Sequence, residues 1–80
     1  MSEKLHYSMV VQWSSQDQAY LVTLPEWEGR VINPITHGDT YEEAIKSGHE
    51  VLEALIASAS KHGEPLPAPH VFAGELSGGR

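Results

Sequence analysis

The strongest pattern in the chain is a helical repeat of apolar positions over residues 38–63. Apolar or small side chains recur there at intervals of three and four, which is the spacing of one buried helix face. These positions are Tyr41, Ala44, Ile45, Gly48, Leu52, Leu55, Ile56 and Ala59. The pattern predicts one long helix with a single apolar face, roughly 33 Å from end to end at the standard rise per residue.

Signals at both ends bound this helix. Thr40 and Glu43 have the spacing of a capping box, in which each side chain accepts a hydrogen bond from the other residue's backbone N–H. Asp39 offers a second acceptor, and Glu42 adds negative charge at the positive end of the helix dipole. Gly63 suits a left-handed C-cap. We therefore expect Asp39, Thr40 and Glu43 to cap the helix.

Two stretches upstream alternate between apolar and polar residues, as strands do. Residues 7–13 read YSMVVQW, and residues 19–24 read AYLVTL. The first run would bury Tyr7, Met9, Val11 and Trp13 on one face. The polar run SSQDQ lies between the two stretches. Two alternating runs joined by a polar loop predict a β-hairpin.

Weaker signals predict the other elements. Residues 31–37 form a short third strand, which Asn33-Pro34 interrupts. Prolines at every second position predict an extended arm over residues 65–69. Residues 70–80 hold either a short last strand, on Val71 and Phe72, or a tail.

These elements predict a single α+β domain over residues 1–80, with its core at about residues 7–69. Its sheet is small and mostly antiparallel, one long helix packs across one face, and the order is β-β-β-α-β. A chain this short buries a modest share of its surface and leaves strand edges open. We therefore expect a homodimer or a dimer of dimers.

The charge balance favours protein partners over nucleic acids. Five basic residues against eleven acidic ones give a net charge of −6. Affinity for DNA and RNA depends largely on basic groups that neutralise phosphates, so we expect no direct nucleic-acid binding. An acidic chain is better suited to a basic protein partner. The alternative is that the charge serves solubility alone.

No residues form a pattern typical of catalysis, and we expect neither an enzyme nor a cofactor. There is no Cys, and no Ser lies in a G-x-S-x-G context. Five His residues raise the possibility of a metal, with His37 and Asp39 at one turn. No His pair has the spacing of a zinc-protease helix, and His37 is more simply explained as a loop residue before the cap. We expect no metal site.

Trp27 is the residue that the sequence singles out for binding. It lies in a polar turn between Glu26 and Glu28. An exposed Trp with acidic neighbours suits recognition of a basic protein, because Trp is enriched at binding hot spots. Glu42 and Glu43, at the helix start, are further candidate contacts. The alternative is that the Trp27 ring folds back over the edge of the sheet.

Nothing in the sequence predicts export or membrane insertion. The first residues, MSEKLHYS, lack an apolar run, and the longest apolar runs are far too short to span a bilayer. We expect a cytoplasmic protein without a membrane segment.

The order of these motifs resembles the HicB-like antitoxin family of type II toxin–antitoxin systems. The resemblance covers about residues 7–69: an upstream hairpin, Leu24-Pro25, Gly29, the run THGDTYEEA, the helix with Gly63, and the closing PLPAP. It implies a partial RNase H-like fold without a working nuclease site. It also implies that the chain binds and neutralises a small basic toxin of the HicA type, which cleaves mRNA.

Two other functions remain open at this point. One is a solitary oligomeric domain with a regulatory role and no toxin. The other is a residual metal-dependent nuclease, in which Asp39 would be needed for RNA cleavage.

Overall fold

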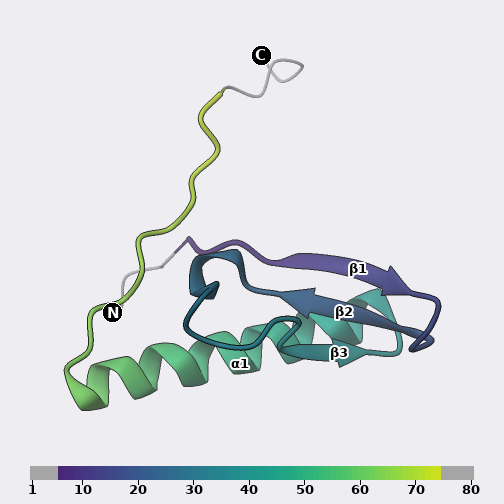
Figure 1. The fold of residues 1–80 in the computed structure, drawn as a ribbon, viewed down its shortest axis with the longest axis horizontal. Helices are drawn as coiled ribbons and strands as arrows, with labels where there is room; N and C mark the ends of the chain where they lie inside the picture. The colour runs from purple at the N-terminus through teal and green to yellow at the C-terminus, as the bar shows by residue number, and fades with distance from the viewer. Residues whose placement is uncertain (1–5, 75–80) are drawn as a thin grey trace.

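A three-stranded sheet with one long helix across one face forms the body of the molecule (Figure 1). The computed structural model describes residues 6–74. In chain order the elements are β1 (Val10–Ser14), β2 (Ala19–Thr23), the short 3-10 turn η1 (Pro25–Trp27), β3 (Thr36–Gly38) and α1 (Tyr41–His62). This confirms the predicted α+β class and the order β-β-β-α.

The sheet is antiparallel throughout, with β2 in the centre. Val11 pairs with Val22 across the predicted hairpin, and Val22 pairs with Thr36 on the other side. β1 begins at Val10, three residues later than the alternation predicts. The reason is that the backbone N–H of Ser8 donates to the side chain of Glu26, which takes this part of the chain out of the strand ladder.

Both ends of α1 are capped by the residues that the sequence predicts, except that Asp39 takes part through its backbone N–H, as a donor, and not as the predicted acceptor. The hydroxyl of Thr40 accepts from the N–H of Glu43 at 3.1 Å. The Glu43 carboxylate accepts from the N–H of Asp39 at 3.2 Å, whereas the prediction paired it with the N–H of Thr40. Gly63 adopts the left-handed conformation at φ 68°, which satisfies carbonyls of the last turn.

The core lies between β2 and the inner face of α1. Val22 and Leu24 are fully buried there, and Trp27, Ala44 and Leu52 complete the cluster. Four of the predicted helix positions are buried: Ala44, Gly48, Leu52 and Ala59. Tyr41 and Ile45 are exposed, although the periodicity places them on the buried face. The first turns of α1 therefore present apolar side chains to solvent.

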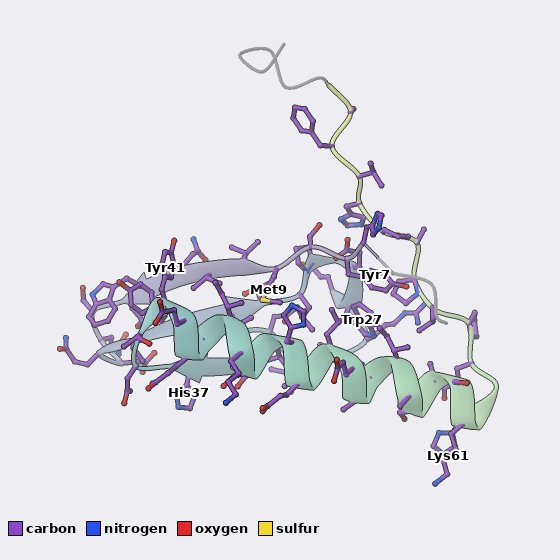
Figure 2. All side chains as sticks on the ribbon, turned by 180° about the vertical axis from the view of Figure 1, so that it is seen from behind. Tyr7, Met9, Trp27, His37, Tyr41 and Lys61 are labelled. Carbon is purple, nitrogen blue, oxygen red and sulfur yellow. The ribbon has the colours of Figure 1, made fainter. Side chains whose placement is uncertain are left out.

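Gly48 marks the closest approach of α1 to the sheet. A Cβ atom at this position would lie 2.7 Å from Met9 Sδ and 3.0 Å from Val22 Cγ1. Contacts between carbon or sulfur atoms at such distances are repulsive, so the helix can pack this closely only without a side chain here. Figure 2 shows Met9 between the sheet and the helix.

After Gly63 the chain continues as an extended arm, as its prolines predict (Figure 1). The Tyr7 hydroxyl donates to the carbonyl of Pro67 at 2.6 Å, and Arg30 Nη1 donates to the carbonyl of Pro65 at 2.9 Å. The predicted last strand is not formed over residues 70–74, because the arm crosses the chain near Ser8 and then runs away from the sheet. The rest of that predicted segment lies outside the described residues.

Among residues 6–74, no helix has the length and apolar character that a bilayer crossing requires.

Candidate protein-binding surface

The structure contradicts the predicted exposure of Trp27. Its side chain is only 4% exposed and belongs to the core cluster. The ring packs edge-on against Tyr7, with 4.7 Å between ring centroids. The 3-10 turn at Pro25–Trp27 reverses the chain and turns the indole inward, so that it lies on the sheet side of α1 (Figure 2). The alternative, in which the ring folds back over the sheet, is the correct one.

Glu26 is likewise buried, at 6% exposure, and the prediction that it contacts a partner is wrong. Both carboxylate oxygens accept from the N–H of Ser8, at 3.2 and 3.1 Å. Oε2 also accepts from the N–H of His70, at 2.7 Å. The side chain therefore joins the segment before β1 to the C-terminal arm. Of the three residues predicted around this turn, only Glu28 remains exposed.

The environment of Glu26 favours its charged form. Burial alone would raise the pKa of this carboxyl, but the backbone N–H groups of His70, Glu26 itself and Ser8 outweigh that effect and lower the pKa below its ordinary value. Burial, and after it the negative charge of Glu26, raises the pKa of Tyr7. The Tyr7 hydroxyl donates a hydrogen bond to the carbonyl of Pro67.

The carboxylates at the start of α1 are exposed, as predicted. Glu42 and Glu43 lie in its first turn, and Asp39 lies just before it. Asp39 and Glu43 line an open hollow of about 410 Å³ whose other lining residues are His37, Gly38, Lys46, Ser47 and Glu50. Glu43 already accepts from the N–H of Asp39, so Glu42 and Asp39 have the carboxylates that are most available to a partner.

A cluster of aromatic rings lies beside these carboxylates, and sequence reasoning missed it. Trp13 of β1 packs edge-on against Tyr20 of β2, with ring centroids 5.0 Å apart. Tyr20 in turn lies 4.9 Å from the ring of Tyr41, the first residue of α1. Trp13 is 49% exposed and Tyr41 is 56% exposed. These three rings and Ile45, one helical turn after Tyr41, are called the aromatic surface below.

The register of the sheet explains why this cluster is open to solvent. Trp13 pairs with Tyr20, on the same face as Val11 and Val22, so alternation predicts that it is buried. However, β1 is an edge strand, and α1 starts at Tyr41, over the end of the hairpin. The helix therefore leaves Trp13 partly uncovered. Figure 2 shows Tyr41 and Lys61 at opposite ends of α1.

The site offers surface for protein contact, with carboxylates at its border. Glu42 follows Tyr41 at the start of α1, whereas Asp17, in the hairpin loop, lines a different hollow with Leu21 and His37. His37 and Asp39 both border the hollow at the start of α1, yet the part of the chain that is described contains no group of three or more His, Asp or Glu side chains that could hold a metal ion. Comparison with models of protein families, with curated proteins and with solved structures finds no match for the chain.

Proposed function

We propose that this chain is an antitoxin-like binding protein that neutralises a small basic, mRNA-cleaving toxin of the HicA type through its aromatic surface. The observation that carries the proposal is the half-exposed cluster of Trp13, Tyr20 and Tyr41 beside the acidic start of α1. The resemblance to HicB-like antitoxins supports the class of partner, and the net charge of −6 supports its basic character.

Large aromatic side chains are the residues that most often dominate a binding interface. They bring large apolar areas to a contact and lose little conformational entropy when they are held. Here the rings hold one another in place before any partner arrives, because Tyr20 touches both Trp13 and Tyr41. Such pre-organisation lowers the entropic cost of binding. Exposed ring faces can also accept an Arg or Lys side chain through cation–π contact.

The proposed mechanism is competition with RNA for the same basic surface. A protein that cleaves mRNA must bind phosphates, and it does so largely with Lys and Arg. Glu42 and Asp39 present exposed carboxylates at the start of α1, next to Tyr41 of the aromatic surface, where they can pair with those basic side chains. An inhibitor of this kind needs no catalytic group of its own. It needs only to cover the toxin's RNA-binding surface.

Opposite charges also speed the encounter of the two proteins. A chain of net charge −6 attracts a basic partner from a distance, and salt screens this attraction at separations beyond about 10 Å at 0.1 M. Contacts made by the aromatic rings, which become buried in the complex, depend less on salt. The association rate should therefore fall as salt rises, while the dissociation rate changes little.

The test is binding to the small basic protein encoded by the neighbouring gene, measured as association and dissociation rates at low and high salt. Trp13→Ala should weaken the complex by about 2 kcal/mol or more, roughly thirtyfold, if Trp13 is a hot spot. Glu42→Lys should mainly slow association. Ile32→Ala is the matched control, because Ile32 is apolar and 87% exposed but lies outside the aromatic surface.

Two results would contradict the proposal in different ways. If wild-type protein forms no complex with that neighbour at micromolar concentration, the antitoxin function is wrong. If a complex forms but Trp13→Ala behaves like Ile32→Ala, the function stands and the aromatic surface is the wrong site. A growth-rescue assay with the toxin expressed in cells, run on the same variants, checks both results independently.

A further inference from the structure

The C-terminal arm, residues 65–74, is held firmly at its base and left uncovered at its tip. Tyr7 and Arg30 donate to the carbonyls of Pro67 and Pro65. The N–H of His70 donates to the buried Glu26 carboxylate, and the His70 carbonyl accepts from the hydroxyl of Ser8 at 3.4 Å. The next two side chains, Val71 and Phe72, are 75% and 74% exposed.

A second surface, on which the strands carry apolar and uncharged polar residues, lies open on the sheet. Side chains alternate between the two faces of a strand. Val11, Val22 and Thr36 are paired across the sheet and face α1, so the residues next to each of them along the strands face away. The face directed away from α1 is called the outer face here, and it carries Val10, Gln12, Ser14, Ala19, Leu21, Thr23 and His37. No described helix or strand covers it (Figure 1).

The outer face has a hollow large enough to take an aromatic ring. Its volume is about 390 Å³, and its lining residues are Asp17, Ala19, Leu21, Pro34, Thr36 and His37. Leu21 is paired with Gln12 on one side and with His37 on the other, which places the hollow at the middle of the sheet.

Charge identifies a second copy of the chain as the occupant. Two copies that each carry −6 repel one another unless they meet through uncharged surfaces. The arm from Pro65 to Gly74 has no Asp, Glu, Lys or Arg, and neither have the three strands. The strands and the arm therefore offer a basic partner no opposite charge, and Asp17 is the one carboxylate among the lining residues of the hollow. A second copy would bury both of these surfaces at once.

We propose that two copies of this chain associate by exchanging their C-terminal arms. Val71 and Phe72 of each copy lie on the outer face of the other, and each Phe72 ring occupies the hollow beside Leu21. A chain's own arm leaves the body beside Ser8 and runs away from its own sheet, so the contact is made between copies (Figure 1). Two-fold symmetry gives every contact twice, and the arm and the strands of the outer face, which carry no charged side chain, together form one continuous interface.

This assembly is compatible with the proposed binding of a toxin but does not depend on it. The aromatic surface lies on the α1 side of the sheet, whereas arm exchange uses the opposite side. Glu26 positions the arm for this exchange. It accepts a hydrogen bond from the N–H of His70, and this bond fixes the point from which Val71 and Phe72 leave the body of the molecule.

The first test is sedimentation of the full chain across micromolar concentrations. Wild type should sediment at twice its monomer mass of 8.8 kDa. The double variant Val71→Ser/Phe72→Ser should raise the dimer dissociation constant at least tenfold, while Ile32→Ser, at another exposed apolar position, should leave it unchanged. Because these side chains are exposed, the variants should keep the wild-type circular dichroism spectrum.

The second test uses the absence of Cys from the chain. A protein carrying only Phe72→Cys is mixed with one carrying only Gln12→Cys, on the outer face, under mild oxidation. We expect a disulfide-linked heterodimer to form much faster than in a mixture of Phe72→Cys with Glu53→Cys, an exposed position on α1. A monomeric wild type, a dimer that survives Val71→Ser/Phe72→Ser, or equal cross-linking to both partners would each overturn arm exchange.

Discussion

Replacing Glu26 by Gln tests the most unusual feature of the structure, a buried carboxylate that joins two distant segments. Gln has nearly the same shape, so the substitution removes the charge without opening a cavity. Its amide oxygen can take the place of Oε2 and keep the N–H donors of Ser8 and His70. Its NH₂ group then takes the place of Oε1 and faces the N–H of Ser8. Both groups are donors, so no hydrogen bond can form between them.

The expected loss of folding stability follows from the two backbone donors, the N–H groups of Ser8 and His70. Hydrogen bonds to an ionised acceptor are roughly twice as strong as neutral ones, and a neutral bond contributes about 1 kcal/mol. Loss of charge at two N–H donors therefore costs about 2 kcal/mol, and the easier burial of a neutral amide offsets part of this. We expect Glu26→Gln to lower the free energy of unfolding by about 1–2 kcal/mol at pH 7. Glu28→Gln, on an exposed carboxylate, should change it by less than about 0.5 kcal/mol.

The effect should depend on pH in a defined direction. The folded pKa of Glu26 lies below the ordinary value of 4.5 that applies to the unfolded chain. A group with a lowered folded pKa contributes its full stabilisation above its unfolded pKa and loses it as the pH falls through the folded pKa. The difference between wild type and Glu26→Gln should therefore be constant from pH 7 down to about pH 5 and should shrink as the pH falls further.

Denaturant unfolding at several pH values measures this difference, and amide hydrogen exchange locates it. The N–H of His70 should lose protection in Glu26→Gln, while the N–H of Val22, in the core, should change only with global stability. Equal unfolding midpoints for wild type and variant at pH 7 would refute the reasoning. So would a stability difference that grows as the pH falls below 4.5.

Three further substitutions test the fold. Thr40→Ala should cost about 1 kcal/mol in denaturant melts, because the cap on the N–H of Glu43 is lost; an unchanged midpoint would mean that Thr40 does not cap. Gly48→Ala gains about 1 kcal/mol of helix propensity but overpacks the core against Met9 at a cost of about 1–3 kcal/mol, so thermal melts should show a net loss that Met9→Ala relieves. Trp27→Ala should cost about 3–5 kcal/mol and be visible as lost circular dichroism on mild heating, and a fully stable variant that merely loses partner binding would contradict the core position of Trp27.

The elements that the sequence predicts well are those with local causes. The cap at Thr40, the left-handed Gly63 and the periodicity between them lie within one stretch, so α1 can be predicted almost to the residue. The hairpin also depends on neighbours in sequence, because alternation and a polar loop are enough to define it. Gly48 is another residue with a local signal, because Gly inside a helix is costly unless another segment packs closely against it, as Met9 and Val22 do here.

The candidate binding surface was harder to predict because it depends on contacts between distant residues. Glu26 is buried only because Ser8 and His70, which are 18 and 44 positions away, bring their N–H groups to it. The inward orientation of Trp27 needs the ring of Tyr7, from the segment before β1. Trp13 is exposed because it lies on an edge strand at the point where the helix begins, which alternation alone cannot show.

The most direct test of the account is inhibition of RNA cleavage. The small basic protein encoded by the neighbouring gene is assayed on mRNA while the chain is titrated in at fixed salt. We predict that wild type and Ile32→Ala stop cleavage near equimolar ratio, and that Trp13→Ala, with its fold intact by circular dichroism, needs roughly thirtyfold more protein. Cleavage that continues unchanged at a large excess of wild type would contradict the central claim.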